Sequence, residues 1–84
     1  MSHTKNTLQS REIVNAETAR QFHLHAIEHL EKALAFHRDA VGNHAQGEYA
    51  LAARNAALAQ THMQHASEHT ASATKHSCEQ MFYK

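Results

Sequence analysis

The chain has 84 residues and a mass of 9.4 kDa, which is enough for one small domain, expected to span residues 1–84. Eight Lys and Arg balance eight Asp and Glu, so the formal net charge is zero with histidine neutral. This balance argues against binding to nucleic acid or to an anionic membrane surface, because both require an excess of Lys and Arg. No apolar run is long enough for a transmembrane helix. The single cysteine, Cys78, excludes an intrachain disulfide.

The first ten residues, MSHTKNTLQS, contain no apolar stretch of the kind found in a secretory signal. We therefore expect a cytoplasmic protein. The alternative is a periplasmic protein whose export signal has been removed.

The composition favours long helices, because proline is absent and glycine occurs only at Gly42 and Gly47. The predicted segments are a tail at 1–9, a helix at about 10–41, a turn at 42–47, a helix at about 48–78 and a tail at 79–84. Gly42 and Asn43 are expected to end the first helix in the left-handed conformation. Asn43 or Gly47 is expected to cap the second.

Alanine recurs every seven residues in both halves of the chain, and the two series mirror each other about residue 46. They comprise Ala19, Ala26, Ala33 and Ala40, and then Ala52, Ala59, Ala66 and Ala73. An antiparallel hairpin requires this register, with small side chains that let the two backbones approach closely. Alanine is abundant in this chain, but two symmetric series about the glycine turn favour the hairpin over chance.

Large apolar side chains occupy a wide arc of each predicted helix, including Phe22, Leu30 and Phe36 in the first and Leu51 and Leu58 in the second. Two helices cannot bury arcs this wide against each other, and a chain of this length has a small core. We therefore expect an all-α fold in which an antiparallel two-helix hairpin pairs with a second copy as a dimeric four-helix bundle. A monomeric hairpin is the alternative.

Five of the ten histidines have the three- and four-residue spacing that places side chains on one helical face. They are His25 and His29 in the first helix and His62, His65 and His69 in the second. The antiparallel register brings both groups to one flank of the hairpin. Neutral imidazole suits Cu(II), Zn(II) and Ni(II). The pattern therefore predicts that these five histidines bind a divalent transition metal (copper, zinc or nickel) for buffering, storage or sensing.

A second interpretation makes the same histidines a pH-sensitive surface on a non-catalytic interaction module, because clustered imidazoles repel one another once protonated. Enzyme activity is not expected. The chain has no Gly-rich phosphate loop, nucleophile elbow or His-Glu-x-x-His motif, and no glutamate precedes a histidine by three residues as in a di-iron centre. Accordingly, we predict no catalytic residue and identify no small-molecule substrate.

Two short segments, HAIEHL at 25–30 and HASEH at 65–69, resemble the His-Ala-x-x-His repeats of the small metal-binding protein family. Members of this family are bacterial His-rich helical proteins that bind copper and other divalent ions. The resemblance covers roughly residues 19–76 and implies metal buffering or storage by helical hairpins. The chain departs from the family in having Cys78, a Phe-Tyr end and no recognisable export signal.

Overall fold

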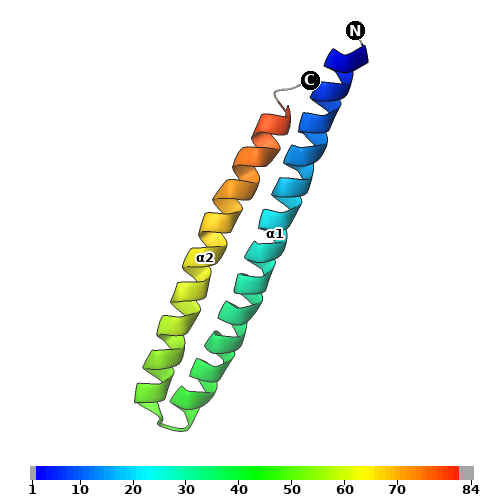
Figure 1. Cartoon of the computed structure of the whole chain (residues 1–84). Coiled ribbons are helices and arrows are strands. Elements are labelled where there is room, and N and C mark those ends of the chain that lie inside the picture. Colours follow the sequence, from blue (N-terminus) through cyan, green and yellow to red (C-terminus); the bar gives the residue numbers. More distant parts are fainter. Residues whose placement is uncertain (1, 82–84) are drawn as a thin grey trace.

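In a computed structural model the chain forms two antiparallel helices, α1 (Ser2–Ala45) and α2 (Tyr49–Met81), joined by a turn at 46–48. The structure describes the backbone of residues 2–81 and the side chains of residues 13–77. The helices lie side by side, with the turn at one end of the molecule and both termini at the other (Figure 1). The hairpin is a rod of 69 × 13 × 13 Å. Neither helix contains, in its described residues, a stretch long and apolar enough to cross a bilayer.

The first helix continues through Gly42 and Asn43, which were expected to end it, so the turn is shorter than predicted. Gly47 is the helix-ending residue, with a φ of 75° that favours glycine. The Glu48 amide donates to the Asn43 carbonyl at 2.8 Å, and the Gly47 amide donates to the His44 carbonyl at 3.2 Å. These two hydrogen bonds form a Schellman motif, which satisfies carbonyls that a helix end otherwise leaves unpaired.

The second helix starts directly after the Schellman motif. The Glu48 carbonyl accepts the first helical hydrogen bond, from the Ala52 amide at 2.9 Å. Glu48 is therefore the N-cap residue of α2, in place of Asn43 or Gly47. The Asn43 side chain has a different role, because its Oδ1 accepts a 2.7 Å hydrogen bond from Asn55 Nδ2 and ties the two helices together near the turn.

Both helices extend further toward the termini than the sequence pattern predicts. Residues 2–9 and 79–81 are helical, although they were expected to be tails. The remaining tail positions, 1 and 82–84, lie outside the described residues, as does the side chain of Cys78.

The core of the hairpin is a row of alanines, as the seven-residue spacing predicts. All eight alanines of the two series are buried, with exposed fractions between 0% and 8%. Among the described residues no side chain larger than alanine is fully buried. Small side chains at every seventh position let α1 and α2 pack closely in antiparallel register, which confirms the predicted hairpin.

A second row runs along one side of the alanine row and consists of the residues three positions after each alanine. Its members are all half-buried: Phe22, His29, Phe36 and Asn43 from α1, and Asn55, His62, His69 and His76 from α2. We call these eight residues the ring row. Because the two series are mirrored, side chains from both helices meet along this row. The ring row positions the candidate site.

Candidate metal centre

His29 lies at the centre of a cluster of five imidazoles on the side of the molecule that carries the ring row. Its ring centroid is 5.1 Å from that of His62, 5.0 Å from that of His65 and 5.5 Å from that of His69. His25 joins the cluster through His69, at 5.3 Å. The structure therefore brings together all five histidines singled out by their spacing, two from α1 and three from α2.

Within the cluster, His29 and His62 contact each other directly across the two helices. Their Nδ1 atoms are 2.9 Å apart, although the residues are 33 positions apart in the chain. One Nδ1 must donate a proton and the other must accept it, so the donor ring, when neutral, carries its free lone pair on Nε2, away from this contact. A lone pair of this kind is what a metal ion requires from imidazole.

His25 and His65 form the outer rim of the cluster, and about half of each side chain is exposed. Each has a glutamate three residues later on its own helix. His25 Nδ1 is 3.9 Å from Glu28 Oε2, and His65 Nδ1 is 3.8 Å from Glu68 Oε2. A carboxylate beside one ring nitrogen favours a proton on that nitrogen and leaves the other available as a ligand. The two repeats thus present the same His–Glu pair from opposite helices.

The surroundings of His29 disfavour its protonation. The pKa of His29 is lowered from its ordinary value of 6.5, first by partial burial between the two helices. The positive charges of His65, His62, His69 and Lys32 lower it further. Because a metal ion binds only the deprotonated ring, this shift keeps His29 available as a ligand under mildly acidic conditions.

Two phenylalanines of the ring row bracket the cluster. Phe36 stacks on His62 at 5.6 Å, and Phe22 lies 6.0 Å from His69 and stacks on His76 at 5.7 Å. The sequence pattern placed both phenylalanines on the apolar arc of the first helix. Phe22, Phe36 and His76 share one sequence feature: each lies three residues after a buried alanine. This position places them in the same row as His29 and His62.

The imidazole centroids are close together, but two of the four ring pairs are stacked and the other two are tilted by only 31° and 34°. Among residues 13–77, no three His, Cys, Asp or Glu side chains already stand in a metal-holding arrangement. Two imidazoles on one tetrahedral ion, with metal–nitrogen bonds of about 2.0–2.1 Å, have ring centroids roughly 5 Å apart. The four spacings in the cluster, from 5.0 to 5.5 Å, already match this distance. For two of these rings to share an ion, they would have to turn about their side-chain torsions.

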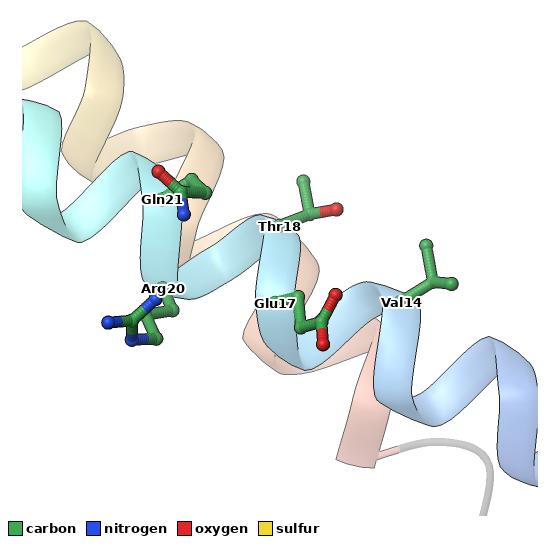
Figure 2. Close-up of a pocket in the computed structure, with 5 residues that line it drawn as sticks. All are labelled: Val14, Glu17, Thr18, Arg20 and Gln21. Atoms are coloured by element: carbon green, nitrogen blue, oxygen red, sulfur yellow. The ribbon is translucent and has the colours of Figure 1, made fainter.

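An open surface pocket lies further toward the chain termini. It is lined by side chains of α1 alone: Val14, Glu17, Thr18, Arg20 and Gln21 (Figure 2). These side chains point outward from one helix, and no histidine of the cluster lines the pocket. All of the lining comes from one helix, whereas a bound small molecule usually loses most of its surface to the protein.

Comparison of the chain with models of protein families, with curated proteins and with solved structures finds no match. The resemblance to the small metal-binding proteins therefore stays at the level of the two short histidine repeats.

Proposed function

We propose that the protein binds a divalent transition metal ion, Cu(II), Zn(II) or Ni(II), through the five clustered histidines, and that it serves in metal buffering, storage or sensing. The proposed ligands are His25, His29, His62, His65 and His69. One observation carries the proposal: the ring centroid of His29 is 5.0–5.5 Å from the ring centroids of three imidazoles on the facing helix. Three or four convergent imidazoles form a ligand set suited to these ions.

Two features of the cluster favour metal over a merely polar surface. The ligands come from both helices, so a bound ion cross-links α1 and α2 at a point remote from the turn. The lowered pKa of His29 reduces the competition between protons and metal at the central ligand. Because the ion binds the folded hairpin and not the separated helices, binding raises the stability of the hairpin.

The proposal is tested by isothermal titration of chelator-stripped protein with Cu(II), Zn(II) and Ni(II) at pH 7.5. We expect saturable binding at fixed stoichiometry with Kd below about 1 μM, and a higher melting temperature for the loaded protein. Binding weaker than about 100 μM, without fixed stoichiometry, would overturn the metal proposal.

Matched variants distinguish specific binding at the cluster from nonspecific binding to the many histidines of the surface. His29→Ala removes the central ligand, and we expect it to weaken binding at least tenfold. His37→Ala removes an exposed imidazole of α1 that lies outside the cluster, and we expect no change. Equal losses in the two variants would show that the ion binds nonspecifically to a His-rich surface.

We also propose that two hairpins associate into a four-helix bundle. The alanine row is the only fully buried part of the described hairpin, while several large apolar side chains remain exposed. Alanine burial alone provides little apolar area, so the hairpin needs a second surface to reach ordinary stability. Light scattering on the metal-free protein tests this, with a dimer mass as the expected result and a monomer mass as the contrary one.

The second candidate function is a helical interaction module whose assembly depends on pH, and the lowered pKa of His29 favours it. Protonation of stacked imidazoles places like charges about 5 Å apart, which opposes close packing. A module of this kind dissociates below about pH 6, near the ordinary histidine pKa, whether or not a chelator is present. Metal binding without any change of mass between pH 5 and 7.5 would exclude this function.

A further inference from the structure

The hairpin exposes a row of apolar side chains on the side opposite the ring row. Ile27, Leu30, Leu34 and Val41 follow one another on α1 at spacings of three, four and seven residues, and they are between 43% and 70% exposed. Met63 of α2 is 46% exposed and, like Leu30, lies four positions after a buried alanine. Residues four positions after an alanine lie across the alanine row from those three positions after it. We call these five residues the apolar flank.

The exposed area of the hairpin exceeds what a compact protein of its mass leaves in water. The accessible surface is 6350 Å², whereas a folded monomer of this mass exposes about 5000 Å². The difference, roughly 1300 Å², is larger than the about 800 Å² that each partner contributes to a standard interface. One further partner at an interface of standard size therefore covers more than half of this excess area.

The apolar flank is complementary to itself about Leu34. Ile27 lies seven residues before Leu34 and Val41 lies seven residues after it, so an antiparallel α1–α1 pairing brings Ile27 against Val41 of the second copy. Glu31 and Arg38 are both exposed and lie three before and four after Leu34. The same pairing therefore places Glu31 beside Arg38 of the second copy. Self-complementarity of this kind is what a twofold interface requires.

We infer that a second copy of this chain docks on the apolar flank, with the twofold axis near Leu34. This inference rests on the dimer proposed above and assigns the face of the hairpin that forms its interface. The ring row and the five histidines then lie on the outer sides of the four-helix bundle, one cluster per hairpin. Each metal site is complete within one chain, and dimerisation neither builds nor blocks it.

The test is sedimentation equilibrium of metal-free protein at pH 7.5, with helicity checked by circular dichroism. We expect Leu34→Glu to raise the dimer dissociation constant at least 100-fold, because it places two carboxylates at the axis. Leu51→Glu is the matched control. Leu51 is 39% exposed and lies four residues before Asn55 of the ring row, on the other side of the molecule, so the dimer should persist.

A charge exchange tests the register without burying a charge. We expect Glu31→Arg to weaken the dimer several-fold and Glu31→Arg/Arg38→Glu to restore it. A monomeric wild-type protein would overturn both the proposed dimer and this interface. A wild-type dimer that survives Leu34→Glu but not Leu51→Glu would overturn the interface alone. Neither result bears on metal binding, which the titration of the monomer or dimer measures separately.

Discussion

The two glycines have opposite roles, although both lie close to the turn. Gly42 is helical, and a methyl group added there meets no atom within 4 Å. Gly47 has a φ of 75°, which other residues adopt at a cost. We expect Gly42→Ala to raise the free energy of unfolding by about 0.5–1 kcal/mol and Gly47→Ala to lower it by about 1–2 kcal/mol. Urea unfolding monitored by circular dichroism measures both, and equal effects would contradict the assignment of Gly47 as the helix end.

At the candidate site the histidine spacing was sufficient to predict which imidazoles come together. Spacings of three and four residues put His25 with His29 and His65 with His69 on helical faces, and the mirrored alanines set the register between the faces. The stacking of Phe22 on His76 was not predicted. This contact forms because both side chains lie on the same side of the alanine row, and the heptad spacing alone did not single out that side.

Among the secondary-structure elements, the alanine row fixes how closely the helices approach. Ala59 is 0% exposed at the centre of the hairpin, and we expect Ala59→Leu to lower the free energy of unfolding by about 1–3 kcal/mol, because the added carbons have no space between the backbones. Ala57→Leu is the matched control, since Ala57 is exposed on the same helix. The midpoint of thermal unfolding reports the difference. A tolerated Ala59→Leu with unchanged helicity would indicate that the helices separate easily.

The same seven-residue period that predicted the helices could not predict their ends. A glycine inside a helix costs about 1 kcal/mol relative to alanine, which the hydrogen bonds of a long helix readily offset. Gly42 is therefore retained in α1, and the chain turns at Gly47, where the Schellman hydrogen bonds involve Glu48 and Asn43. The choice between two nearby glycines depends on these contacts, which no local pattern in the sequence specifies.

For the molecule as a whole, the mirrored alanines divide the surface into two flanks of different chemistry. The ring row carries four imidazoles, and the apolar flank carries five of the exposed large apolar side chains. The radius of gyration is 19.2 Å, compared with about 12 Å for a compact chain of this length. A rod of this shape presents both flanks over most of its length, so metal binding and self-association can use separate surfaces of one small protein.

The pH dependence of stability follows from the cluster. Because the pKa of His29 in the folded hairpin is lowered from 6.5, the unfolded chain binds more protons at this position below pH 6.5. The free energy of unfolding therefore falls as the pH drops below about 6.5, toward the lowered pKa, and His29 contributes no pH dependence well above 6.5. We expect His29→Gln to flatten the decline between pH 7.5 and 5, measured by urea unfolding of metal-free protein. The control His23→Gln, at an exposed imidazole outside the cluster and before the first residue of the apolar flank, should retain it. An identical decline in wild type and His29→Gln would show that the central imidazole is not the group that couples protonation to folding.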